Sequence, residues 1–561
     1  PARFTGAPIG GVINIVTKKP AGLGGSITQG FKSYGGYNAT YQINTPLGDG
    51  SLLATWQRDI WQGDFNFKPH YLYPNLSGGD PKEIKRQGNG YQNNNGMVKW
   101  QDDHWMVKAA YKNLQENLPS KVGELFDKDN PVDPLQPGTL LYWRPQNYEK
   151  GFWDSHLSTR QKEFLIGWNN TKNRLSYGLQ MSYLDQKKDY LNTGYYRRYQ
   201  YLEDWGIANP EANGGMQDIT SPGGLWSHYH SKKWNLDLHT SYHLWSNHLL
   251  EFHGDISRES MDADVSGRKT YWSMLENLGL QFIHHYQINE YHFNLQDTIT
   301  LNDAGDFKAT LIGRADRVDM ETMSSSDQSW KYSGGAALDK QINEHWGLKT
   351  TWGTYNRHPN FYELFGDGAT IAPNAGAGTY FGAKGGNTWE HGTQFDFGVN
   401  WQGKMLRADT STTLTWFDRH AKNQFALWTP VVPNAHSTYF PMDKASVHGI
   451  ELTHSMQWKR VTLTLAGTWQ KPEYSGAEQL RSVGSSASYK TSISYTPEWV
   501  FNARLDYLWP GDRFSTFMEW NYMDKQFTGQ TTGSAPTDNQ SWWMSSLSTI
   551  DVGAKYKFSR G

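Results

Sequence analysis

The sequence predicts an all-β protein, a transmembrane antiparallel β-barrel, and three observations carry this prediction. Apolar and polar residues alternate with a period of two along much of the chain. No apolar run approaches the length of a membrane-spanning helix, although tryptophan and tyrosine are unusually frequent. The connections between the predicted strands are alternately short and long.

Composition narrows the class of protein. The chain has 561 residues with 26 Trp and 32 Tyr, and its mean hydropathy is −0.73. A helical membrane protein is excluded because the chain has no run of about 20 apolar residues. A polar average with many aromatic residues is typical of a membrane barrel, which has a wet inner face and aromatic girdles at both rims. Secreted carbohydrate-binding β proteins are also rich in Trp and Tyr, so composition leaves that alternative open.

Charge and motif content exclude several functions. The chain has 53 basic and 55 acidic residues, a net charge of −2, which gives no electrostatic case for nucleic-acid binding. Cysteine is absent, so disulfides and thiolate metal sites are unavailable. We find no nucleophile elbow, phosphate-binding glycine loop or His-Glu-x-x-His motif, and therefore expect no enzyme and no intrinsic cofactor.

The first predicted element is a short strand within residues 6–20, Gly-Ala-Pro-Ile-Gly-Gly-Val-Ile-Asn-Ile-Val-Thr-Lys-Lys-Pro. Its glycines indicate a close backbone approach, and Pro20 ends the ladder. An ordinary buried strand would have the same pattern. The run resembles the closing segment of the plug domain of TonB-dependent outer-membrane receptors, with Gly10, Gly11, Asn14 and Lys18 as its motif residues. The resemblance implies that residues 1–23 are the C-terminal end of a plug and that residues 24–561 are a transmembrane barrel.

The strands that follow have one apolar and one polar face. The clearest example is residues 234–244, and residues 175–183, 307–311 and 461–465 repeat its pattern. We expect the apolar face to contact lipid. In the first example this face consists of Trp234, Leu236, Leu238, Tyr242 and Leu244, and the polar face of Asn235, Asp237, His239, Ser241 and His243.

Connection lengths indicate which ends of the strands share a side of the membrane. Outer-membrane barrels have short periplasmic turns and longer extracellular loops, whereas a soluble sandwich has no reason to segregate its loops. This rule requires residues 276–301 to form one long strand rather than two strands joined at Asn289. Short joins are predicted near residues 102–103, 170–172, 246, 304–305, 343–344, 403–404, 459 and 510–511, and long loops at 61–91, 115–158, 188–230, 261–275, 358–388, 421–435, 474–498 and 527–542.

The pattern yields about twenty strands, the last of them within residues 550–558. Receptors of the family that the first segment resembles have twenty-two strands. We therefore expect a barrel of the 22-stranded type from which the last two strands and most of the plug are missing.

A second resemblance lies at residues 355–368, which look like the Arg-Ala-Pro…Glu-Leu-Phe/Tyr-Gly segment that opens an extracellular loop in many of these receptors. Arg357 and Tyr362 belong to this segment, and His358 stands where alanine is usual. Haem receptors of the family often use a histidine in this loop, which makes His358 a candidate haem ligand. Residues 387–392 resemble the returning strand, with Trp389 in place of the usual proline.

Further candidate ligand-binding residues lie in the predicted extracellular loops. Arginines among tyrosines suit a flat anionic ligand such as a ferric siderophore, although a girdle with arginines at lipid head groups would have the same composition. Alternate histidines on one strand face could ligate a metal or haem iron, although chance pairs are expected among 19 His. The first group is Tyr195, Tyr196, Arg197, Arg198, Tyr199 and Trp205, the second is His228 and His230, and Trp143 with Arg144 forms a third.

The family resemblance implies a receptor in the outer membrane of a diderm bacterium, surrounded by outer-membrane lipid and lipopolysaccharide. It further implies active uptake of a small-molecule iron chelate, driven by the TonB–ExbB–ExbD complex through an N-terminal segment outside this sequence. A ferric siderophore is the preferred ligand, and haem or cobalamin is the alternative. A passive porin or adhesin-like barrel would explain the strands and loops, but not residues 10–19.

Overall fold

The computed structural model describes residues 19, 22–67, 84–86, 89–117, 155–192, 225–266, 285–320, 329–365, 371–372, 389–428, 437–442, 444–476, 489–527 and 543–556. Within them the chain is almost entirely β-structure, and a single helix of five residues, α3 (Phe361–Phe365), is present. None of the described helical segments is long and apolar enough to cross a membrane.

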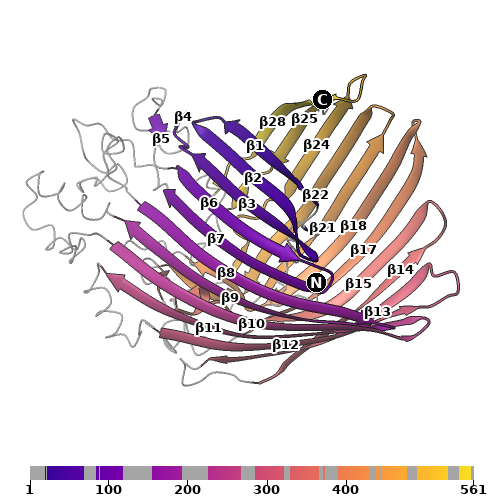
Figure 1. Ribbon diagram of the computed structural model, residues 1–561, viewed down its shortest axis with the longest axis horizontal. Coiled ribbons are helices and arrows are strands. Elements are labelled where there is room, and N and C mark those ends of the chain that lie inside the picture. The colour runs from indigo at the N-terminus through magenta and orange to yellow at the C-terminus, as the bar shows by residue number, and fades with distance from the viewer. Residues whose placement is uncertain are drawn as a thin grey trace, which may run out of the picture.

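One antiparallel sheet of 21 strands forms the wall of the molecule and curls round from β1 to β28 (Figure 1). Its long strands pair in chain order, and the short strand β23 pairs with the end of β22, which also pairs with β24. Among the described pairings, β1 pairs with β2 and β28 pairs with β25. The strands are β1 (Gly24–Lys32), β2 (Gly36–Leu47), β3 (Gly50–Trp61), β6 (Tyr91–Gln101), β7 (Trp105–Asn117), β8 (Ser155–Lys172), β9 (Leu175–Asn192), β10 (Leu225–Trp245), β11 (His248–Ser266), β12 (His285–Thr300), β13 (Phe307–Met320), β14 (Lys331–Gln341), β15 (Trp346–Arg357), β17 (Glu390–Met405), β18 (Ala408–Lys422), β21 (Lys444–Gln457), β22 (Val461–Gly476), β23 (Tyr489–Thr491), β24 (Trp499–Leu508), β25 (Phe514–Met523) and β28 (Leu547–Tyr556).

Three small sheets lie in the connections. The first pairs β4 (Phe65–Phe67) with β5 (Ile84–Arg86), and the second pairs β26 (Gln526–Phe527) with β27 (Trp543–Met544). The third contains β16 (Ile371–Ala372), β19 (Gln424–Trp428) and β20 (Ser437–Met442).

The connections are segregated by length, as the sequence predicts, except that the short connection 33–35 between β1 and β2 lies at the same end as the long ones. At one end of the wall they run from two residues (48–49) to six (301–306), and the long connections lie at the other end. We call these the turn end and the loop end. Two turns lie further along the chain than predicted, at 173–174 and 406–407, where Asn173, Leu406 and Arg407 adopt positive φ. The strands also extend into the predicted loops 188–230 and 261–275, and the sequence prediction omitted the connections at 33–35, 48–49 and 321–330.

The region around Asn289 is one strand. β12 runs without interruption from His285 to Thr300 and pairs with β11 and β13 on its two sides. The prediction of a single strand is therefore confirmed for residues 285–300, and residues 276–284 lie outside the described part of the chain.

The outer face of the wall is apolar and exposed. Trp234, Leu236, Leu238, Tyr242 and Leu244 are all exposed, although a soluble sandwich would bury such a face between two sheets. In the described residues no second sheet covers them. Their exposure agrees with the predicted lipid-facing role.

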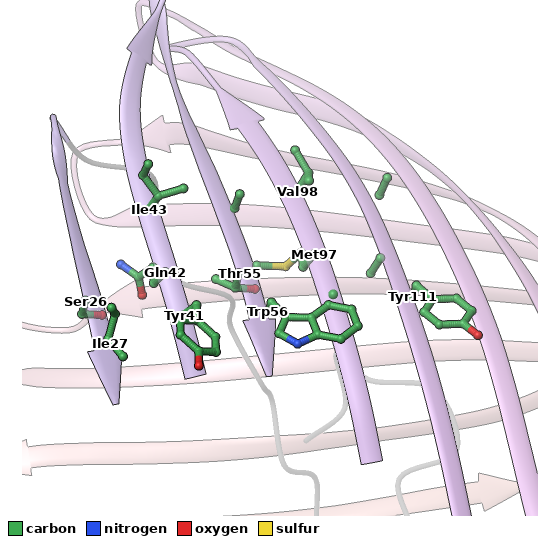
Figure 2. A pocket seen from close by; sticks show the side chains of 14 residues that line it. Ser26, Ile27, Tyr41, Gln42, Ile43, Thr55, Trp56, Met97, Val98 and Tyr111 are labelled. Carbon is green, nitrogen blue, oxygen red and sulfur yellow. The ribbon is translucent and has the colours of Figure 1, made fainter. Parts of the chain in front are cut away.

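A shallow hollow of about 540 Å³ interrupts this outer face on β1, β2, β3, β6 and β7. Figure 2 shows Ile27, Tyr41, Ile43 and Trp56 around it on neighbouring strands. Small residues such as Gly96 leave the space, and the Trp56 ring partly covers Gly96. Because the hollow lies in the apolar wall, it belongs to the predicted lipid-facing surface.

Two hydrophobic clusters lie on the opposite, inner face near the loop end. One joins β15, β18, β19, β20, β21, β22 and residue 493, and the other joins β10–β13 to α3 and Trp389. The second cluster positions the site described next.

Candidate functional site

The helix α3 is fixed by its own first turn. The Asn360 N–H donates to Glu363 Oε2 at 2.7 Å, and the Glu363 N–H donates to Asn360 Oδ1 at 3.0 Å. This reciprocal pair is a capping box, which satisfies backbone N–H groups that have no partner within the helix. Local sequence therefore explains why the chain turns into a helix so soon after β15.

Arg357, the last residue of β15, ties α3 to the wall. Its Nη1 and Nη2 donate to the Glu363 carboxylate at 2.8 and 3.0 Å. Its Nε donates to Glu390 Oε2 at 2.8 Å, and the Tyr355 hydroxyl donates to Glu390 Oε1 at 2.9 Å. The Glu390 side chain is 1% exposed, so Arg357 compensates a carboxylate that is shielded from water.

Aromatic rings of α3 pack against the inner face of the wall. The Phe361 ring centroid lies 5.3 Å from that of Tyr286 and 6.2 Å from that of Tyr229, both edge to face. The Tyr362 centroid lies 5.8 Å from that of Tyr229, and Lys188 Nζ lies 5.1 Å from the centre of the Tyr362 ring. We call Lys188, Tyr229, Tyr286, Phe361 and Tyr362 the luminal aromatic site.

The accessible part of this site is small and cationic. Tyr229, Tyr286 and Phe361 are buried, whereas Tyr362 and Lys188 are half-buried. A cation beside an aromatic face can bind an anionic ring by charge pairing and stacking. The site therefore suits an anionic, aromatic or planar small molecule.

Ionic side chains lie next to the aromatic residues along the same strands, toward the turn end. Lys233 Nζ lies 2.8 Å from Glu290 Oε2, and the Ser257 hydroxyl donates to the same oxygen at 2.9 Å. Asp316, which is fully buried, accepts from Arg314 Nε at 2.8 Å and lies 2.6 Å from His292 Nδ1. These carboxylates are compensated by cations or hydrogen-bond donors, as buried charges must be.

His358 interacts electrostatically with this ionic layer and packs against Trp389, with ring centroids 5.3 Å apart. Its Nε2 is buried and has no hydrogen-bond partner among the described residues. Burial lowers the pKa of His358 to about 4, against the opposing influence of the Glu290 charge. The ring is therefore neutral at pH 7. Within the described part of the chain, no group of three or more His, Cys, Asp or Glu residues could hold a metal ion.

Two connections meet over the inner face beside this site. β16, from the connection after β15, pairs in parallel with β20, from the connection after β18. α3 also lies against β20. Phe417 of β18, Ala426 of β19 and Met442 of β20 are all buried in one cluster, which joins β19 and β20 to the wall. The described parts of these connections therefore act as one packed unit.

The structure brings three of the predicted candidates together, since Arg357, His358 and Tyr362 all belong to this site. It places His228 and His230 elsewhere, on the outer face that also carries Trp234, because the pairing register is continuous along β10. There His228 Nδ1 lies 2.5 Å from Asp189, and His230 Nε2 lies 3.3 Å from Asp185.

Other predicted candidates lie outside the described residues. These are the aromatic and cationic loop residues and the plug-end motif, namely Trp143, Arg144, Tyr195, Tyr196, Arg197, Arg198, Tyr199, Trp205, Gly10, Gly11, Asn14 and Lys18.

Sequence reasoning missed Lys188, Tyr229 and Tyr286. A signal for Tyr229 was present. It has an odd number in β10, whereas the outward apolar residues that begin at Trp234 have even numbers, so Tyr229 faces the other side of the sheet. Extending that alternation backward from Trp234 would have turned Tyr229 inward and the two histidines outward.

Comparison with protein families gives one match. The model described as "TonB dependent receptor-like, beta-barrel" matches residues 110–561. A search of curated proteins finds no match.

Solved structures resemble the chain closely in fold and weakly in sequence. The siderophore receptor PirA from Acinetobacter baumannii has a TM-score of 0.66 and 16% identity, over 100% of this chain and 77% of that one. The FrpB iron transporter from Neisseria meningitidis (F5-1 variant) has a TM-score of 0.63 and 14% identity, over 96% of this chain and 76% of that one. The copper transporter OprC has a TM-score of 0.62 and 12% identity, over 97% of this chain and 73% of that one. At such identities the likeness establishes the fold alone.

Proposed function

The chain belongs to the TonB-dependent receptors, non-enzymatic β-barrel transporters of the outer membrane, and we propose that it takes up an iron chelate, namely a ferric siderophore. Membership of the family implies an interaction with TonB and a small-molecule substrate. We also propose that the TonB–ExbB–ExbD complex supplies the energy for uptake. We also retain the proposed division into a plug end at 1–23 and a barrel at 24–561.

The luminal aromatic site is the observation that carries the choice of ligand. Lys188 and Tyr362 offer a cation and a ring side by side on the inner face, at the loop end. Iron chelates of the catecholate class are anionic and planar in parts, which matches this pair. Arg357 supports the pair indirectly, because its bidentate contact with Glu363 holds α3 in place.

Two of the similar structures support an iron chelate, since PirA is a siderophore receptor and FrpB an iron transporter. OprC, a copper transporter, is similar to the same degree. The proposed ligand therefore rests on the luminal aromatic site and not on the similarity to these structures.

Haem is the weaker candidate. A histidine that ligates its iron needs an accessible ring nitrogen, and the Nε2 of His358, the candidate ligand, is buried beside Trp389. Haem binding through His358 would require α3 and Trp389 to move first.

The test is a binding titration of the purified full chain with a ferric catecholate, a ferric hydroxamate and haem, followed by quenching of protein fluorescence. We expect the ferric catecholate to bind, and Tyr362→Ala to weaken it about fivefold to tenfold through loss of stacking. Tyr332→Ala is the matched control, because Tyr332 is a tyrosine on the outer face and 73% exposed.

Uptake of radioactive iron completes the test in cells that express the full chain. We expect uptake that depends on TonB and falls in the Tyr362→Ala variant. If only haem binds, or if uptake persists without TonB, the proposed function is wrong.

A further inference from the structure

The outer face of β8–β11 changes character abruptly on the loop side of the apolar band. The last apolar outward residues on these strands are Phe164, Tyr183, Trp234 and Ile256. The next two outward positions toward the loop end are Lys162 and Arg160 on β8, Asp185 and Lys187 on β9, Lys232 and His230 on β10, and Arg258 and Ser260 on β11. Five of these eight side chains are permanent cations and one is a carboxylate. We call Arg160, Lys162, Lys187, Lys232 and Arg258 the outer basic patch.

Strand register makes the patch continuous. Arg160 lies directly opposite Lys187, which in turn lies opposite His230. Lys162 and Lys232 flank Asp185 on its two sides. Like charges directly opposite each other on neighbouring strands are destabilising, so this arrangement calls for a negative partner.

The residues that the structure describes supply few such partners. Arg160 Nη2 lies 3.2 Å from Asp189, and Arg258 Nη2 donates to the uncharged Gln287 at 2.8 Å. Lys162, Lys187 and Lys232 form no ion pair with any described residue, and all three are exposed. Asp185 is engaged by His230 at 3.3 Å. Three lysines in one patch therefore remain available to an external anion.

The position of the patch identifies the source of that anion. On β10 the aromatic residues Trp234 and Tyr242 bound the apolar band, and the eight-residue step between them spans ~26 Å along the strand. With a strand tilt of about 40° this corresponds to ~20 Å across the membrane, close to the ~25 Å height of an outer-membrane apolar band. On β11 the patch begins level with Trp234, at Arg258, and on β10 it begins one outward position beyond Trp234, at Lys232. This is the level of lipid head groups in the leaflet at the loop end.

We propose that the outer basic patch binds the phosphate groups of a phosphorylated lipid in the outer leaflet, whose acyl chains lie along the apolar band below it. Phosphate accepts hydrogen bonds from several ammonium and guanidinium groups at once, which relieves the repulsion between Arg160 and Lys187. A freely dissolved phosphate would not use the apolar residues that border the patch, whereas a lipid uses both. This binding is separate from substrate uptake, because the patch and the luminal aromatic site lie on opposite faces of the wall.

The experiment measures binding of diphosphorylated lipid A to the full chain in detergent, by native mass spectrometry and by the shift in unfolding temperature. Fully dephosphorylated lipid A and inorganic phosphate are the comparison probes. The variant carries Lys162→Gln, Lys187→Gln and Lys232→Gln. The matched control carries Lys112→Gln, Lys308→Gln and Lys349→Gln, which remove three lysines from the inner face.

We expect the wild-type protein to bind the diphosphorylated lipid more tightly than the dephosphorylated one, and inorganic phosphate not to compete at equal concentration. The outer triple variant should lose about fivefold in affinity per lysine, and the inner triple variant should bind as the wild type does. Heat-dependent mobility in electrophoresis establishes that both variants are folded. The comparison of the two lipids on the wild-type protein remains decisive if a variant fails to fold. Equal binding of the two lipids, unchanged binding by the outer variant, or competition by inorganic phosphate would overturn the proposal.

Discussion

Leu238→Arg tests the assignment of the two faces of the wall most directly. Leu238 lies on the outer face of β10, 41% exposed, midway between the aromatic residues Trp234 and Tyr242. Its cross-strand neighbours are Leu179 and Gly254, neither of which could pair with a cation. The new guanidinium would therefore stand in hydrocarbon near the membrane midplane.

The expected cost follows from that depth. An arginine on the lipid face of an outer-membrane barrel costs about 2–4 kcal/mol at the midplane and about 0–1 kcal/mol near the interface. We expect the upper range for Leu238→Arg and the lower range for Leu244→Arg, because Leu244 lies beyond Tyr242 at the edge of the band. Ser241→Arg places the same charge on the inner face, where a surface substitution changes the stability by about 0.5 kcal/mol or less.

The measurement is the free energy of unfolding of the full chain in phospholipid vesicles, from guanidinium titrations followed by tryptophan fluorescence. The three variants introduce the same residue, arginine, into three different environments. A cost for Leu238→Arg no larger than that for Ser241→Arg would refute the assignment of the outer face.

Two further predictions concern the inner site. Arg357→Met leaves the buried Glu390 and Glu363 without their cation and should destabilise the region of α3 by about 3–5 kcal/mol, seen as faster hydrogen exchange in residues 358–365. Arg317→Met, which removes an outward pair with Asp319, is its control and should leave that exchange unchanged. Because burial lowers the pKa of His358 to about 4 from an ordinary 6.5, the unfolded chain binds the additional proton between these values, so the free energy of unfolding should fall as the pH drops from 6.5 to 4. The loss is at most about 3 kcal/mol, and His358→Gln should remove that part of the pH dependence; an identical slope in the variant would show that another group titrates.

The fold could be predicted from sequence because its determinants are local. The alternation of residues 234–244 indicates which side chains share a face of the sheet. The lengths of the connections indicate which ends of the strands lie on the same side of the membrane. The same rules place β12 correctly as one strand. They fail at turns such as 173–174 and 406–407, where neither residue pair contains the glycine that a positive φ normally favours.

The candidate site was only partly accessible to this reasoning. Arg357 and Tyr362 stand out in the sequence, and the capping box of Asn360 and Glu363 is local. Alternation becomes ambiguous between residues 227 and 233, because polar residues occur on both faces there, and the side on which His228 lies could not be judged from that segment alone.

The sequence by itself thus determined the strand periodicity, the lipid-facing surface and the family, because each depends on residues close together in the chain. Only the tertiary structure decided that α3 folds back onto β10 and β12, bringing Phe361 and Tyr362 to Tyr229 and Tyr286. It also decided that lysines and arginines of four strands form one patch, since this depends on strand register. Contacts between residues tens of positions apart are fixed by packing and pairing of the whole wall, and no local pattern records them.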